Sequence, residues 1–448
     1  MTGRGWILLV AALALVGAVV VAVPRLEGGE PVIEMVSELV VGAAPREVGI
    51  ELSDEGAGLR TLEVRLAHAG GETALLDRRF PGGWLQGGAR GTDRQHLVVR
   101  VDAGSLGLAD GDAELVVAAR DWSWRGAFAG NRSELRIPVR IDTLPPRLDV
   151  ESGLTYVHRG GSAAVVYRVD PDAAEHGVRV GDAVFHGFSL NGDSSRKLAL
   201  FAVPVDAPPE PAVYVVAVDA AGNETQASFP ARILEREFER ATVSLPAGFL
   251  TRVVSALASA TGVRTDDPVA AFQEINVEIR RRNEDRIREV VRGSGNERYW
   301  EGAFSQLPGS VVTSGFAEQR SYRVEGRPVS EARHYGFDLA STRAAPVTAA
   351  NAGVVLFADD LGIYGNCVIL DHGQGLTSLY GHLSRLDVQV GDRVAKDQPL
   401  GLSGATGLAG GDHLHFAILV GGTYVDPLEW WDPKWVHSHV ETRIGTGE

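Results

Sequence analysis

The chain has a single cysteine and fewer basic than acidic side chains, and both shortages restrict what it can be. With Cys367 as its only cysteine, it can form no internal disulfide. Cys367 lies in the apolar run Asn366–Leu370 with no base beside it, so we expect a small buried side chain and not a nucleophile. The 43 basic and 58 acidic side chains give a formal net charge of −15. Because nucleic-acid-binding proteins present basic surfaces, we expect no nucleic-acid partner.

An apolar run of eighteen residues, from Trp6 to Val23, lies near the N-terminus between Arg4 and Arg25. As a helix it is long enough to span a hydrocarbon core of ~30 Å. A cleavable signal peptide is the alternative, but the run is long and Pro24 follows where a small-residue cleavage site is wanted. No cysteine lies near the run, which excludes a lipoprotein. We therefore expect residues 1–29 to be an uncleaved, single-pass signal anchor in the cytoplasmic membrane.

Residues 30 to 235 have the pattern of a β-rich region, with short alternating runs separated by Gly and Asp clusters. The region contains a faint repeat, because Val116–Asp121 and Val215–Asp219 are similar strands that each lead into a turn and a final strand. The repeat resembles two immunoglobulin-like β-sandwich modules in tandem, joined at Leu144-Pro-Pro146. We place the modules at residues 30–144 and 145–235.

Residues 236–305 are expected to form a helical connector. Asp267 is predicted to cap a helix that has Pro268 at its first position. The apolar residues that approximate one helical face are Phe272, Ile275, Ile279, Ile287 and Val290. We expect this face to pack on the body of the protein and not on a membrane, because acidic residues interrupt the basic face.

Two segments near the C-terminus carry closely spaced histidine and aspartate. His413 and His415 are two apart in an apolar run, so on a strand both imidazoles leave the same face. His334 and Asp338 would lie about 13 Å apart on a straight strand, and Gly336 between them favours a bend or bulge. We interpret the segments as one zinc site with His, Asp and His as protein ligands and a fourth position for water. The other histidine of the pair then remains free for acid–base chemistry.

A second pair, His437 and His439, offers a comparison within the same chain. It lies in a polar segment, residues 434–448, with no rigid apolar strand to hold it, so we expect a solvated tail. The first pair differs because Leu379–Leu383 adds another histidine, His382, on an apolar strand in the same part of the chain.

A series of ordered motifs between about Leu307 and Trp431 carries a family resemblance. The motifs are His334-x-Gly-x-Asp338, Pro346-Val347 followed by Ala349 and Gly353, Gly362-x-Tyr-Gly365-Asn366, Asp371-His-Gly373, Tyr380-Gly-His382-Leu, Val390-Gly-Asp-x-Val394, Gly404-x-Thr-Gly407 and His413-Leu-His415-Phe. This segment resembles the lysostaphin-type (LytM-like) zinc metalloendopeptidases, which cut peptide cross-links of bacterial peptidoglycan.

The resemblance implies specific roles for five residues. His334, Asp338 and His415 would be the ligands of a Zn²⁺ ion. His382 and His413 would be catalytic histidines that do not bind the metal.

The segment departs from the family pattern at Asp412, where proline is common, and at Ala417, where glutamate is common. Neither is a ligand or catalytic position, so the two departures bear on the details of the substrate more than on the expected activity. His372 occupies a recurrent but non-catalytic position, and we expect it at the surface.

The expected architecture is mainly β: a membrane anchor, two β-sandwich modules, a helical connector, and an antiparallel β metallopeptidase domain at residues 306–433. The resemblance implies hydrolysis of peptide bonds in peptidoglycan stem peptides or cross-links. That substrate places residues 25–448 on the periplasmic, extracytoplasmic side of the cytoplasmic membrane. Any protein regulator is expected to bind the sandwich modules or the connector.

A non-catalytic LytM-like adaptor that activates another cell-wall hydrolase is the alternative function. The presence of every expected ligand and catalytic residue argues against it. A metal-carrying or sensory protein is a third alternative, but it does not explain His382.

Overall fold

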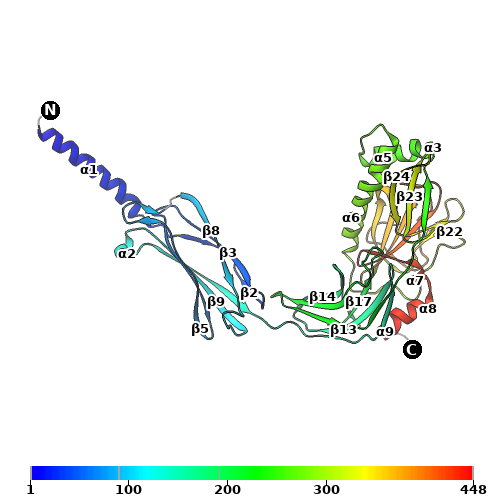
Figure 1. Cartoon of the computed structure of the whole chain (residues 1–448), viewed down its shortest axis with the longest axis horizontal. Helices are drawn as coiled ribbons and strands as arrows, with labels where there is room; N and C mark the ends of the chain where they lie inside the picture. Colours follow the sequence, from blue (N-terminus) through cyan, green and yellow to red (C-terminus); the bar gives the residue numbers. More distant parts are fainter. Residues whose placement is uncertain (1–2, 89–90, 191, 446–448) are drawn as a thin grey trace. The chain divides into compact units, whose positions relative to one another are not determined.

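The computed structural model describes residues 3–88, 91–190 and 192–445 of the chain (Figure 1). The chain forms two compact units. The first contains Met1–Pro146 and Val218–Glu224, and the second contains Arg147–Ala217 and Thr225–Glu448. Strands account for more of the chain than helices, so the prediction of a mainly β protein is confirmed.

The first unit begins with helix α1 (Gly3–Arg25), which contains the apolar run. Trp6–Arg25 is long and apolar enough to cross a membrane by length and composition, and its large apolar side chains are exposed. A signal sequence near the N-terminus would meet the same criteria. The helix is therefore compatible with the predicted anchor.

Two sheets after α1 enclose one core. The three-stranded sheet has the order β1 (Val32–Glu34), β3 (Arg46–Asp54), β8 (Gly91–Val101). The five-stranded sheet has the order β2 (Leu39–Val41), β10 (Arg132–Ile141), β9 (Gly111–Asp121), β4 (Leu59–His68), β5 (Gly71–Arg79). Buried side chains alternate along β3 and β9 because successive residues of a strand point to opposite faces. The inward side chains of both sheets form a single hydrophobic cluster, which is the arrangement of a β-sandwich.

The upstream part of the second unit is also built from two four-stranded sheets. One sheet has the order β11 (Leu148–Val150), β13 (Ser162–Val169), β17 (Asp193–Ala202), β16 (Phe188–Leu190). The other has the order β15 (Ala183–His186), β14 (Ala173–Val180), β18 (Val213–Asp219), β19 (Glu224–Ser228). Buried residues of these sheets, such as Val165 and Phe201, belong to the same core as the helices and strands that follow.

Helices occupy most of residues 247–291. They are α3 (Ala247–Phe249), η1 (Leu250–Val254), α4 (Ser255–Thr261), α5 (Pro268–Glu274), η2 (Ile275–Ile279) and α6 (Arg280–Val291). The predicted cap is confirmed, because the Asp267 carboxylate accepts a hydrogen bond of 2.9 Å from the backbone N–H of Val269, with Pro268 at the first helical position.

The predicted apolar face is confirmed for four of its five residues. Phe272, Ile275, Ile279 and Ile287 are buried in the core of the second unit, but Val290 is only partly buried and Val291 takes its place. Val290 and Val291 follow Ile287 on α6 by three and four residues, so both positions border the buried face and the one four residues on is the one that packs.

The C-terminal part of the second unit contains an eight-stranded sheet. Seven strands follow the order β22 (Val311–Ser314), β25 (Phe337–Ala340), β33 (Leu414–Val420), β29 (Leu376–Leu383), β28 (Asn366–Gly373), β27 (Gly353–Asp360), β31 (Arg393–Val394), and β34 (Thr423–Val425) pairs with β33. All these pairings are antiparallel, as predicted. Every residue of β29 and β33 is buried, so these two strands lie in the interior of the unit.

A separate three-stranded sheet carries His334, one of the residues predicted for the site. It has the order β21 (Arg240–Ser244), β23 (Glu318–Val324), β24 (Arg327–His334), with β21 parallel to β23. The segment before the helices therefore contributes a strand to the sheet that carries His334.

The C-terminal segment is not a solvated tail, so that expectation is wrong for the described residues. It forms α8 (Pro433–Val436), η4 (His437–Glu441) and α9 (Thr442–Ile444). Val436, Val440 and Ile444 are buried, because their spacing of four residues puts them on one helical face. His439 stacks on the indole of Trp435, with ring centroids 5.0 Å apart.

The expectation that His372 lies at the surface is also wrong. His372 belongs to β28, between β27 and β29, and is fully buried. Its Nδ1 lies 2.7 Å from the Ala352 carbonyl oxygen and its Nε2 lies 2.7 Å from Ser378 Oγ. Burial lowers the pKa of His372 to about 4, so its role is to join neighbouring strands as a neutral side chain.

The buried helical face can be tested by substitution. Ile279→Asp places a carboxylate where the native side chain is 4% exposed, and we expect it to cost several kcal/mol and lower Tm. Val277→Asp is the matched control, because Val277 lies on the same η2 segment but is 62% exposed. Thermal unfolding monitored by circular dichroism compares the two variants. Equal Tm values for Ile279→Asp and the parent would show that the face is not buried.

Candidate active site

Three side chains from three strands converge at one point in the second unit. His334 ends β24, Asp338 lies in β25 and His415 lies in β33. The sheet register brings two of them together, because Asp338 and His415 are directly opposite each other in the β25–β33 pair. His334 Nε2, Asp338 Oδ1 and His415 Nδ1 are each 3.0 Å from the other two atoms.

Gly336 makes the bend that joins His334 to Asp338. β24 ends at His334 and β25 begins at Phe337, so the predicted bend is confirmed. A Cβ atom at position 336 would lie 2.6 Å from the Phe416 carbonyl oxygen and 2.7 Å from His415 Cε1. The backbone therefore passes too close to the His415 ring for any side chain larger than hydrogen.

The three converging groups fit a Zn²⁺ ion. His334 Nδ1 lies 2.9 Å from the Gly315 carbonyl oxygen; a proton on Nδ1 donates to that oxygen and leaves the Nε2 lone pair facing Asp338 and His415. Two imidazole nitrogens and a carboxylate oxygen are ligands that zinc accepts, and ligands of a tetrahedral zinc lie roughly 3.3 Å apart. The observed separations are close to that value.

The Asp338 carboxyl is held in its ionised form by its neighbours. Burial alone would raise its pKa, but the neighbouring imidazoles of His334, His413 and His415 hold the pKa well below the ordinary value. Arg320 on β23 also contributes, because its Nη2 donates to Asp338 Oδ2 at 2.9 Å. Arg320 Nε donates in turn to Glu318 Oε1 at 2.8 Å, which fixes the guanidinium behind the aspartate.

His413 and His382 lie beside the three groups. His413 Nε2 is 3.5 Å from Asp338 Oδ1, and its Nδ1 is 2.8 Å from the Gly411 carbonyl oxygen. His382 Nδ1 is 2.8 Å from the Thr406 carbonyl oxygen. The two rings are neighbours, with centroids 4.7 Å apart. Each histidine thus has one nitrogen bound to backbone and the other available to the pocket.

The environments of these two histidines differ. Burial, together with the neighbouring His413 and His415, lowers the pKa of His382 to about 3. Burial alone would lower the pKa of His413, but the Asp338 carboxylate raises it above its ordinary value. His382 also has a φ of 64°, a left-handed conformation that is costly for a residue with a Cβ atom.

Helix α6 contacts the loop behind His415. Asn283 Oδ1 accepts a hydrogen bond of 2.9 Å from the backbone N–H of Ile363, and Tyr364 Oη donates to Glu284 Oε1 at 2.7 Å. The Tyr364 ring packs on His415, with centroids 5.4 Å apart. The connector therefore supports a candidate ligand through one intervening tyrosine.

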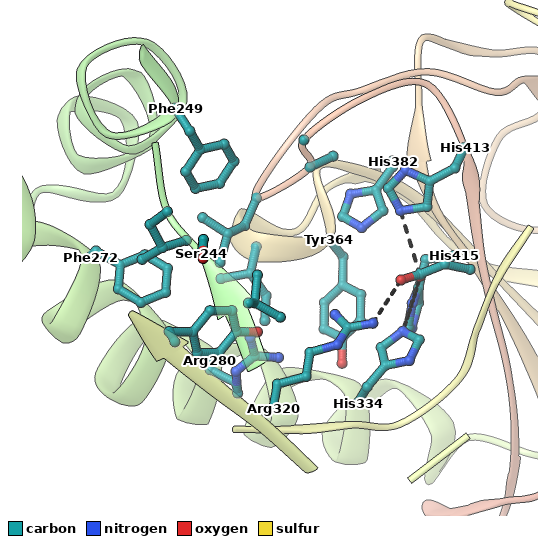
Figure 2. Close-up of a pocket in the computed structure, with 18 of the residues that line it drawn as sticks. Ser244, Phe249, Phe272, Arg280, Arg320, His334, Tyr364, His382, His413 and His415 are labelled. Carbon is teal, nitrogen blue, oxygen red and sulfur yellow. Dashed lines mark hydrogen bonds and ion pairs between the residues drawn. The ribbon is translucent and has the colours of Figure 1, made fainter. Parts of the chain in front are cut away.

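All five residues predicted for the site line one pocket of about 510 Å³ (Figure 2). Figure 2 shows His334, His382, His413 and His415 gathered on one side of it, and Phe249 and Phe272 on the other. The structure therefore brings together His334, Asp338, His382, His413 and His415, while their roles stay predictions. The other pair, His437 and His439, does not line this pocket.

Sequence reasoning missed two features of the site. Arg320 was not identified, although Glu318 and Arg320 share one face of a strand and are a weak sign of paired charges. The contact of Glu284 with Tyr364 had no local sign, because the two residues are 80 positions apart in the chain.

Comparison with known proteins identifies the segment that contains these residues. The profile of Peptidase family M23 matches residues 332–427. Over 118 residues the chain is 36% identical to the Peptidoglycan DD-endopeptidase ShyB of Vibrio cholerae serotype O1, covering 26% of this chain and 27% of the relative. It is 37% identical over 95 residues to the DD-carboxypeptidase/endopeptidase Mpg of Neisseria meningitidis serogroup B, covering 21% and 22%.

A third relative is named as an activator of hydrolases and not as a peptidase. The chain is 37% identical over 100 residues to the Murein hydrolase activator EnvC of Escherichia coli, covering 22% of this chain and 24% of the relative. The chain therefore spans about a quarter of the length of each of these curated relatives.

The metal content of the purified chain tests the proposed ligands. We expect about one zinc ion per chain, and we expect His415→Ala to lose most of it because two protein ligands remain. Elemental analysis of detergent-solubilised protein measures the ratio. The double variant His437→Ala/His439→Ala is the matched control and should keep the parental zinc content. Full occupancy in His415→Ala would overturn the ligand assignment.

Proposed function

Residues 332–427 form a domain of peptidase family M23, and from this premise we propose that the chain is a membrane-anchored zinc metalloendopeptidase. Its proposed reaction is the hydrolysis of peptide bonds in peptidoglycan stem peptides or cross-links. The observation that carries the proposal is the convergence of His334, Asp338 and His415 with two further histidines beside them. The endopeptidase names of relatives matched over this segment support the substrate class.

His334, Asp338 and His415 would hold the Zn²⁺ ion. A bound zinc supplies Lewis acidity, which polarises a peptide carbonyl and makes a water molecule more acidic. The chain's own contribution is to hold the three ligand atoms in place. Gly315 orients His334 through its carbonyl oxygen, and Arg320 orients Asp338 through Oδ2.

His413 and His382 would carry the proton transfers and charge stabilisation. With the proton of each ring on Nδ1 and donated to a backbone carbonyl, Nε2 remains available to accept a proton from water or to donate once protonated. We assign to His413 the deprotonation of the attacking water and to His382 the stabilisation of the developing oxyanion. The geometry is also compatible with the exchanged assignment.

The similarity to a hydrolase activator raises the alternative of a non-catalytic adaptor. Such a protein needs neither zinc ligands nor catalytic histidines. The retention of all five residues in one pocket supports the enzyme instead.

The proposal places the chain in the cytoplasmic membrane through α1, with the peptidase domain on the periplasmic side where peptidoglycan lies. If α1 remains uncleaved, the mature protein keeps its N-terminal residues and resists carbonate extraction from membranes. N-terminal sequencing and extraction of the membrane fraction measure both properties. A mature N-terminus near Arg25 in a soluble periplasmic fraction would replace the anchor with a secretion signal.

Substitution of the two non-ligand histidines separates catalysis from metal binding. His413→Ala and His382→Ala should keep near-stoichiometric zinc, because neither removes a proposed ligand. Loss of a positioned acid–base group typically slows turnover by ~10²–10⁴-fold, and loss of an oxyanion donor by about 10²–10³-fold. Release of muropeptides from purified sacculi, followed by mass spectrometry, measures the rate and identifies the bond. Parental rates in both variants would show that the mechanism is wrong.

A further inference from the structure

The pocket has a second wall that lies outside the segment matched by the peptidase family. Residues between Val243 and Arg252, together with Phe272 and Arg280, line it. Most of these side chains are apolar, including Leu245, Phe249 and Phe272. Because they belong to β21 and the helices of the connector, this wall is a feature of this chain and not of residues 332–427 alone.

The charged residues of the pocket leave an excess of positive charge. They are Arg252, Arg280, Arg320 and Asp338. Arg320 and Asp338 form an ion pair, and Arg320 also pairs with Glu318. In the part of the chain that the structure describes, neither Arg252 nor Arg280 forms an ion pair. A pocket lined by two such arginines, in a chain of net charge −15, favours a ligand with negative charge.

Arg280 is held in a fixed position to meet such a ligand. Its Nε donates to the Asn276 carbonyl oxygen at 3.2 Å and its Nη2 donates to Asn276 Oδ1 at 2.9 Å. Glu284 lies one turn further along α6 and supplies some opposing charge, but its Oε1 accepts the hydrogen bond of Tyr364, and among the described residues it forms no ion pair with Arg280. Figure 2 shows Arg280 between the phenylalanines and the histidines.

We propose that this second wall is a subsite for a carboxylate of the peptide substrate, carried on an aliphatic arm, and that Arg280 is its specificity-determining residue. The inference rests on the proposed peptidase function. A guanidinium held by Asn276 loses little conformational entropy on binding and recognises a carboxylate through paired N–H donors. The apolar side chains of Phe249 and Phe272 cover the aliphatic part, and the pocket volume is in the range that small ligands fill. Arg252 is exposed, so it adds a weaker attraction.

The test compares two forms of one substrate. A cross-linked stem-peptide dimer is isolated from purified sacculi, and a portion is converted to the fully amidated dimer, which lacks carboxylates. We expect the full chain to cleave the carboxylate form with a kcat/KM at least about 10-fold higher. In Arg280→Gln this advantage should fall to about two-fold or less, through a loss of about 10- to 100-fold on the carboxylate form and little change on the amide.

Three controls make the result specific to Arg280. Arg282→Gln changes an exposed arginine on the same helix that pairs with Glu278 outside the pocket, and it should retain the parental preference. Arg280→Lys keeps the charge but loses the paired donors, so it should show an intermediate preference and provides a second variant if Arg280→Gln does not fold. Zinc content and Tm establish that each variant is intact.

The outcomes separate the subsite from the peptidase function. Equal kcat/KM of the parent on both dimers, or an equal loss on both in Arg280→Gln, would overturn the subsite. If the parent cleaves neither dimer, the peptidase proposal fails and calorimetric titration with each dimer decides the subsite. A Kd ratio of about 10 or more that disappears in Arg280→Gln supports it, and equal Kd values refute it.

Discussion

Mutual repulsion among electron-rich groups is the constraint on which the rest of this site depends. His334, Asp338 and His415 present two nitrogen atoms and one oxygen atom at 3.0 Å from each other, in a place from which water is largely excluded. Without positive charge such an arrangement is costly. Arg320 supplies one positive charge from behind Asp338, and the donor set is suited to a second from a metal ion.

The fold maintains this arrangement through several independent elements. The β25–β33 register fixes Asp338 opposite His415, the bend at Gly336 brings His334 to the same point, and β23 delivers Arg320. Because each candidate ligand belongs to a different strand of a buried sheet system, none can move away without disturbing backbone pairing. Preorganisation of this kind limits the reorganisation needed when a substrate binds.

Local patterns predicted those parts of the molecule that depend on neighbouring residues in sequence. The cap at Asp267, the bend at Gly336 and the antiparallel strands around His382 and His415 follow from spacing and residue type. The prediction failed where the decisive contacts join distant residues. The burial of His372 depends on strands that flank it on both sides, and the support of His415 by α6 passes through a contact between Glu284 and Tyr364. The missed burial of the C-terminal helices is different, because the regular spacing of Val436, Val440 and Ile444 was present in the sequence.

Parallel pairing of β21 with β23 has a consequence for how the pocket can be inherited or transplanted. β21 precedes the connector helices, yet it lies beside the strand that carries Arg320, and Val243 and Ser244 within it line the pocket. The smallest segment that carries the whole pocket is therefore much longer than the family segment. A gene fusion that moved residues 332–427 alone would transfer the five histidine and aspartate positions but leave behind Arg320, Arg280 and an entire wall. Exchange between relatives at the edges of the family segment would thus keep the five candidate site residues and change the opposite wall of the pocket.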